Sequence, residues 1–114
     1  MDSIKAVRIN ADDNEITWVD VPIGDGFWDF VYALCNFSCG DMVRTIRGNY
    51  VVVDDEGLMK EPKVGFILKD YPQPLAGNAI IIGPEVNEKT TNCNLTDAEI
   101  KQMIRIVRFK PRVE

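Results

Sequence analysis

Acidic side chains gather at two places in this chain of 114 residues and are its most concentrated reactive groups. The two clusters are Asp12, Asp13 and Glu15, and Asp54, Asp55 and Glu56. Neighbouring carboxylates can bind calcium or magnesium. The first cluster, however, lacks the glycine and the downstream glutamate of a calcium-binding loop, and a tight turn ending at Gly57 accounts for the second. We expect both clusters to be exposed turns without a metal ion, available as a protein-binding surface.

Groups that could act as nucleophiles or bind zinc are few. The chain has three cysteines, Cys35, Cys39 and Cys93, and no histidine. A zinc site needs four ligands, commonly in pairs such as C-x-x-C, and the sequence has no such pair. It also lacks a G-x-S-x-G motif and a phosphate-binding loop. These observations predict a protein that is not an enzyme, has no cofactor or metal, and keeps its cysteines as free thiols.

The balance of charge narrows the class of partner. Eighteen Asp and Glu residues against thirteen Lys and Arg give a formal net charge of −5, which opposes attraction to the phosphates of DNA or RNA. The sequence has no apolar run of about 18 residues, and Met1–Lys5 does not resemble the start of a secretion signal. We expect a cytoplasmic protein that binds neither nucleic acid directly nor a membrane.

The fold is predicted to be α+β, with residues 1–114 in a single small domain. Tyr50–Asp54 and Asn78–Ile82 are rich in β-branched residues and bounded by turn-forming residues, so they are predicted as central strands. The element order is expected to be ββαββββα. The predicted sheet is mixed or mostly antiparallel, has about 4–6 strands, and is built from residues 4–10, 16–21, 42–47, 50–54, 64–69 and 78–82.

Two helices are predicted, near 26–36 and 97–109. The first carries apolar residues at the spacing of one helix face, namely Phe27, Phe30, Val31 and Leu34. Trp28 and Tyr32 widen this face, and we expect both to pack in the core. The second helix begins with Thr96-Asp97-Ala98-Glu99, which matches a capping box, and Pro111 is expected to end it.

Three segments of the chain resemble a small, uncharacterised protein family of bacteriophages and bacterial mobile elements. They are VVVDDEGL at 51–58, GNAIIIGP at 77–84 and LTDAEI at 95–100. The resemblance covers roughly residues 40–104, with an aspartate- and glutamate-rich turn before a glycine and an L-T-D-x-E helix near the end. The chain departs from the family at 60–65, where an asparagine is expected near Lys63 and is absent. The resemblance implies a phage origin and no catalytic residues.

A binding function is the prediction that fits these observations together. A small acidic chain without catalytic motifs suits a phage-encoded inhibitor that occludes a host protein in the host cytoplasm, for example one of a defence system. The alternative is a protein that binds or sequesters a nucleotide-like small molecule in a concave pocket. An enzyme is the third class. Self-association into a homodimer is also compatible with this sequence.

Overall fold

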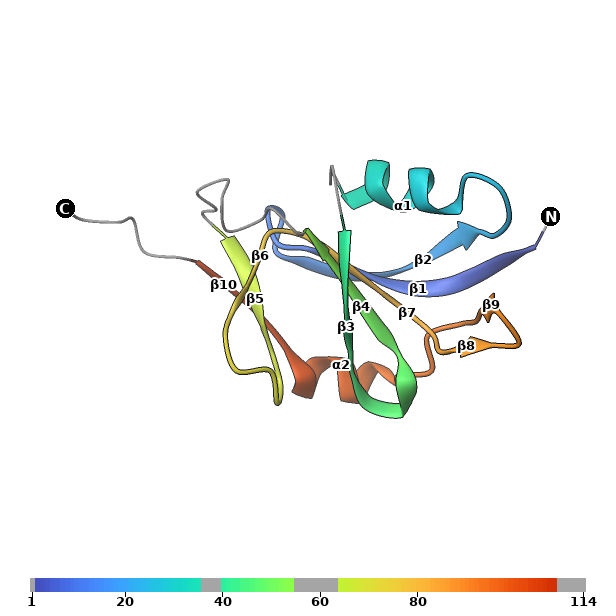
Figure 1. Ribbon diagram of the computed structural model, residues 1–114. Coiled ribbons are helices and arrows are strands. Elements are labelled where there is room, and N and C mark those ends of the chain that lie inside the picture. Colours follow the sequence, from blue (N-terminus) through green and yellow to red (C-terminus); the bar gives the residue numbers. More distant parts are fainter. Residues whose placement is uncertain (1, 36–39, 55–63, 109–114) are drawn as a thin grey trace.

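The apolar run near residue 80 forms the middle strand of the main sheet in the computed structural model, which describes residues 2–35, 40–54 and 64–108 (Figure 1). The helices are α1 (Phe27–Cys35) and α2 (Asp97–Met103), with a short 3-10 turn η1 (Ile46–Gly48). The strands are β1 (Ser3–Asn10), β2 (Glu15–Pro22), β3 (Gly40–Arg44), β4 (Tyr50–Asp54), β5 (Val64–Leu68), β6 (Leu75–Ala76), β7 (Ala79–Ile82), β8 (Glu85–Val86), β9 (Lys89–Thr90) and β10 (Ile104–Arg108).

The main sheet has five strands in the order β2-β1-β7-β4-β3, and every neighbouring pair is antiparallel. All four residues of β7 are buried. Ile80 and Ile82 point to one face of the sheet, and Ala79 and Ile81 point to the other. A strand covered on both faces has no polar positions, which explains its unbroken apolar sequence. The prediction of a central strand here is confirmed.

Helix α1 covers one face of the main sheet (Figure 1). It buries a narrow stripe of Phe27, Val31 and Cys35, four residues apart. Near its last turn the guanidinium of Arg8 donates to the carbonyl of Leu34 at 3.2 Å, a cation placed where the helix dipole favours it.

The prediction that the aromatic flank of α1 packs in the core is wrong for Trp28, which is 39% exposed, and Phe30 is 41% exposed. The helix is only nine residues long, and a single stripe of it touches the sheet. Residues about 100° away on either side therefore reach the surface. Tyr32 is half-buried.

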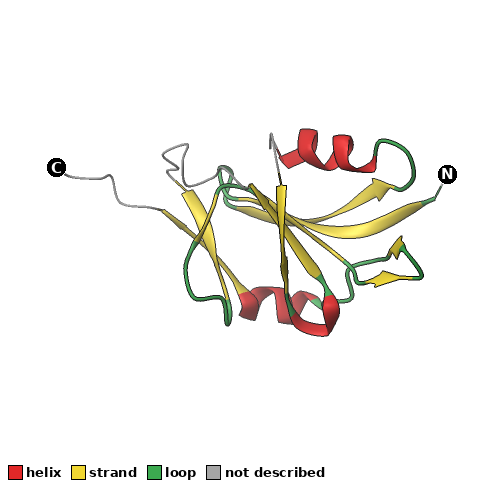
Figure 2. Cartoon of the chain, viewed as in Figure 1, coloured by secondary structure: helices red, strands yellow, loops and turns green. Residues whose placement is uncertain are grey.

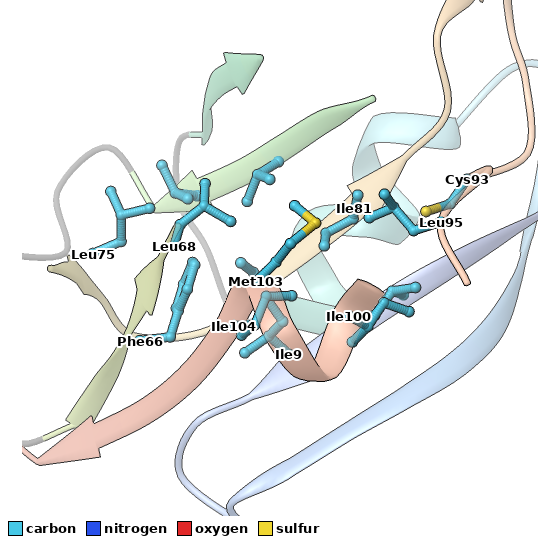
Figure 3. Close-up of a cluster of buried hydrophobic side chains, with 14 residues drawn as sticks. Ile9, Phe66, Leu68, Leu75, Ile81, Cys93, Leu95, Ile100, Met103 and Ile104 are labelled. Atoms are coloured by element: carbon cyan, nitrogen blue, oxygen red, sulfur yellow. The ribbon is translucent and has the colours of Figure 1, made fainter. Parts of the chain in front are cut away.

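The other face of the main sheet packs against α2 and a second sheet of three strands in the order β10-β5-β6. Figure 3 shows the apolar side chains that meet between these layers. Phe66 and Leu68 come from β5, Ile100 and Met103 from α2, and Ile81 from the main sheet. The main sheet is therefore the middle of three layers, and the larger core cluster lies on the α2 side.

The end of the chain departs from the prediction. The helix expected over 97–109 stops at Met103, and Ile104–Arg108 continues as β10, paired along its whole length with β5. The carbonyl of Met103 accepts a hydrogen bond from the N–H of Lys69 at 2.8 Å, and Ile104 has extended dihedral angles of −125° and 128°. Residues 104–107 fit both periods, and pairing with β5 decides between them.

The number of strands also exceeds the prediction, because ten strands in three sheets occur in the described residues. Three of them, β6, β8 and β9, have two residues each and leave no periodic pattern. The strand predicted at 42–47 lies at 40–44, because Arg47 takes a left-handed conformation with φ 55° and the chain turns there. This strand and β4 form an antiparallel hairpin.

Gly83 should tolerate no side chain, because a Cβ atom there would collide with the main-chain carbonyl of Asn92. We expect Gly83→Ala to lower the free energy of unfolding by about 3 kcal/mol, as overpacking against backbone does. Chemical denaturation measures the change. The control is Gly24→Ala, which meets no atom within 4 Å and bears only positive-φ strain of about 1 kcal/mol. Equal losses in the two variants would contradict the close approach at Gly83.

Candidate functional site

The strand register brings the described members of both acidic clusters to one end of the main sheet. Glu15 lies opposite Asn10 on β1, where the β1–β2 loop begins. Ala79 of β7 lies opposite Ile9 of β1 on one side and Val53 of β4 on the other. Asp54, the residue after Val53, therefore lies at the same end of the sheet as Glu15. Three strand spacings of about 4.8 Å separate β2 from β4, or roughly 14 Å. We call Asp12, Asp13, Glu15 and Asp54 the acidic end.

Figure 2 shows that the β1–β2 loop and the end of β4 lie at the opposite end of the sheet from the loop before α1 and the β8–β9 hairpin. Asp12, Asp13 and Glu15 are exposed, and Asp54 is half-buried. Asp55 and Glu56, the other predicted members, lie outside the described residues. The candidate surface is therefore built from the β1–β2 loop with the start of β2 and from the end of β4, which are far apart in sequence.

Two asparagines hold the β1–β2 loop in place. Asn10, only 8% exposed, donates to the carboxylate of Asp13 at 3.0 Å and accepts from the N–H of Asp13 at 3.2 Å. Asn78, next to β7, accepts from the N–H of Ala11 at 2.9 Å, and its amide lies 3.4 Å from the carboxylate of Asp12. These hydrogen bonds fix the direction of both carboxylates. This role of Asn78 is not visible in the sequence, because only the register places it beside the loop.

Within the described residues, the carboxylates of the β1–β2 loop point to different partners. Asp12 and Asp13 face different amide groups, and no group of three or more potential ligands occurs in residues 2–35, 40–54 and 64–108. What the acidic end offers instead is two carboxylates of fixed direction, Asp12 and Asp13, beside the exposed Glu15 and the half-buried Asp54. Such an arrangement attracts cationic surfaces over roughly one Debye length, about 8 Å at physiological salt.

Two shallow hollows flank Tyr71. One, of about 170 Å³, lies between Tyr71 and the carboxylates of Asp41 and Asp54. The other, of about 230 Å³, lies between Tyr71 and the β3 end near Arg44 and Ile46. Sites for small molecules usually enclose about 300–1,000 Å³. Each hollow is small for a nucleotide.

The described cysteines are buried thiols with little reactivity. Burial raises the pKa of Cys35 to about 11, although the nearby Arg8 opposes the shift. Burial also raises the pKa of Cys93, which packs in the larger core cluster. A thiol attacks as its thiolate, so neither group is prepared for nucleophilic chemistry at neutral pH. Cys39 lies outside the described residues.

A second polar cluster joins the β3–β4 hairpin to the start of α2. Arg47 forms a two-pronged ion pair with Glu99, with nitrogen–oxygen distances of 2.5 and 2.6 Å. It also donates to the side chain and the carbonyl of Asn94. The fully buried Asn49 exchanges hydrogen bonds with Asn94 through its Nδ2 at 2.7 Å and its Oδ1 at 3.1 Å. These hydrogen bonds connect the η1 turn to the segment before α2 and to its first turn.

Glu99 has two functions in that cluster. Its carboxylate accepts from the N–H of Thr96, and its own N–H donates to the Thr96 hydroxyl, which confirms the predicted capping box. The hydrogen bonds from Arg47 and then from Thr96 lower the pKa of Glu99 from 4.5 to about 2. The helix start and the hairpin are therefore fastened by one carboxylate.

Comparisons with protein-family models, with curated proteins and with solved structures found no match to this chain. In the described residues, neither helix has the length and apolar composition needed to cross a membrane.

Replacing Thr96 by Ala removes the hydroxyl that accepts from Glu99. We expect the free energy of unfolding to fall by about 1 kcal/mol, which is typical of a lost N-cap. Thr96→Ser keeps the hydroxyl and should retain most of the stability. Thermal denaturation of the three proteins checks this, and identical midpoints for Thr96→Ala and the parent would show that the cap is not formed.

Acid should weaken the fold through Glu99. Because its folded pKa is lower than its unfolded pKa, the carboxylate stabilises the fold fully above about pH 4.5, and this contribution is lost as the pH falls toward 2. Glu99→Gln should therefore differ from the parent most at pH 6 and least near pH 2, as measured by urea denaturation. Arg47→Gln should remove most of the same pH dependence. A difference that does not change with pH would contradict the ion pair.

Proposed function

We propose that this protein binds another protein through its acidic end and blocks that partner's surface. The observation that carries the proposal is the convergence of Asp12, Asp13, Glu15 and Asp54 at one end of the main sheet, from segments about 40 residues apart. Hydrogen bonds from Asn10 and Asn78 hold two of these carboxylates in fixed directions. Fixed charges lose little conformational entropy when a partner binds.

A basic protein surface is the partner that this charge distribution favours. Opposite charges accelerate association and orient the approaching partner, by factors of about 10 to 1,000 in rate. The basic groove of a nucleic-acid-handling host enzyme fits this requirement, and blocking it would inhibit the enzyme. The resemblance to phage and mobile-element proteins supports a host target of this kind, including a component of a defence system, in the host cytoplasm.

Sequestration of a nucleotide-like molecule remains the alternative, with the hollows beside Tyr71 as its place in the structure. Their sizes of about 170 and 230 Å³ give it less support. Heating the purified protein and analysing the released solutes distinguishes the two functions, because only a sequestering protein would release a stoichiometric nucleotide.

The main test compares two variants that lose the same charge at opposite ends of the sheet. The test variant carries Asp12→Asn, Asp13→Asn, Glu15→Gln and Asp54→Asn. The matched control carries Asp25→Asn, Asp29→Asn, Glu85→Gln and Glu88→Gln, which are exposed residues before or in α1 and in the β8–β9 hairpin. Proteins captured from bacterial lysate by the immobilised parent protein are identified and purified, and their association rates with all three proteins are measured at low and high salt.

We expect the test variant to associate at least about tenfold more slowly than the parent and to lose most of its salt dependence. The control variant should behave like the parent. Equal effects of both variants would reduce the role of charge to non-specific attraction. An unchanged rate for the test variant at low salt would refute the acidic end as the contact surface.

A further inference from the structure

The outer strand β2 has a complete row of backbone groups that point away from the sheet. The N–H of Ile23 bonds to the carbonyl of Asp2, which fixes the hydrogen-bonding pattern between β2 and β1. Lys5, opposite Asp20, directs its N–H and carbonyl to Asn92 and Cys93 instead. Because the pattern alternates, Ile16, Trp18 and Asp20 direct their backbone groups outward, away from β1.

This edge is longer and less protected than the opposite edge of the sheet. Strand β3 has five residues, and the outward N–H of Met42 is occupied by the side chain of Asp41 at 2.9 Å. Strand β2 has eight residues, and among the described residues no bond to its three outward N–H groups occurs. Proteins usually block such an edge with prolines or charges. In β2 the only proline, Pro22, is at the end, and the charge of Asp20 in the outward row is balanced by an ion pair with Lys5 of β1.

The side chains of β2 suit a strand-to-strand contact. Its composition of Ile, Thr, Trp and Val favours extended backbone. Trp18 is 41% exposed, and its indole N–H donates to the carboxylate of Asp97 at 2.7 Å, which holds the ring in one orientation. A large apolar ring that is exposed yet fixed is typical of a contact surface.

We propose that β2 pairs antiparallel with β2 of a second copy of this chain, around a two-fold axis at Trp18, to form one continuous sheet through two molecules. The two-fold axis places Trp18 beside Trp18 of the second copy. The N–H of Asp20 then donates to the carbonyl of Ile16 in the second copy. Two-fold symmetry gives the equivalent bond from the N–H of Asp20 in the second copy to the carbonyl of Ile16 in the first.

The distribution of charge favours a second copy in this arrangement. With Trp18 at the axis, Glu15 lies opposite Val21 and Asp20 opposite Ile16, so no two carboxylates of β2 face each other across the new pair. The two acidic ends lie at opposite ends of the joined strands, because the pairing is antiparallel. Glu15 of the second copy lies opposite Val21, six residues along from Glu15, so at about 3.4 Å per residue the two glutamates are roughly 20 Å apart along the strands, which exceeds the Debye length at physiological salt. Dimer formation therefore brings the net negative charges together with little local repulsion.

Amide hydrogen exchange of the purified protein tests the pairing residue by residue. In a monomer, the amides of Thr17, Val19 and Val21 are protected by β1, whereas those of Ile16, Trp18 and Asp20 exchange freely. In the proposed dimer all six are protected. At concentrations where sedimentation gives a dimer mass, we expect Ile16, Trp18 and Asp20 to exchange at least about tenfold more slowly than at dilutions that give a monomer mass.

Two substitutions of Asp20 distinguish the contribution of its backbone N–H to the dimer from the contribution of its side chain. Asp20→Pro removes only an outward N–H and no bond to β1, so the strand should remain folded. Asp20→Ala keeps the N–H and loses the same exposed ion pair with Lys5. We expect Asp20→Pro to raise the dimer dissociation constant at least about tenfold and Asp20→Ala to leave it nearly unchanged.

Three results would overturn the proposal. The first is a monomer mass for the parent protein at all concentrations up to several hundred micromolar. The second is a dimer in which Ile16, Trp18 and Asp20 exchange freely, because the interface would then lie elsewhere. The third is a folded Asp20→Pro variant that dimerises as well as Asp20→Ala. The exchange measurement uses the parent protein alone, so it decides the question even if the proline variant does not fold.

Discussion

The two-sided burial of β7 is the constraint on which the rest of this structure depends. Its four residues send alternate side chains into two separate cores, one under α1 and one under α2. A slip of one residue would exchange the two sets, placing the small Ala79 where Ile80 packs. The neighbours of β7 are consequently fixed in register, since Val7 and Val51 both lie opposite Ile81. The acidic end depends on the same register.

Asparagine side chains connect segments that the strand pairing alone leaves separate. Asn49 is completely buried and links the η1 turn to the segment before α2. Asn78 links the start of β7 to the β1–β2 loop, and Asn10 closes that loop. Each supplies a donor and an acceptor in a neutral side chain, so backbone groups are satisfied without the desolvation of a buried charge. In an acidic protein this keeps like charges out of the interior.

The sequence determines some of these features and not others. Ile80–Ile82 could be assigned to a central strand because no other common element combines that composition with flanking glycines. The end of α2 could not, because Ile104 and Val107 have the spacing of a helix face while Ile104 and Ile106 have that of a strand face, and only contact with β5 selects the strand. Trp28 lies on the surface because α1 touches the sheet along one stripe, which depends on how the layers meet. The acidic residues are visible in the sequence, but their convergence depends on pairing between β1, β7 and β4.

The pairing of β1 with β7 also determines when the protein can fold. Ile9 and Ala79 are adjacent in the sheet yet 70 residues apart in the chain. During synthesis the β1–β2 hairpin and α1 emerge first, with the inner edge of β1 lacking its neighbour until β7 has left the ribosome. Closing so long a loop before its contacts form is entropically costly, and domains with many such pairings fold on the order of milliseconds to seconds. Until β7 has emerged and paired with β1, both edges of the β1–β2 hairpin are therefore open to other chains.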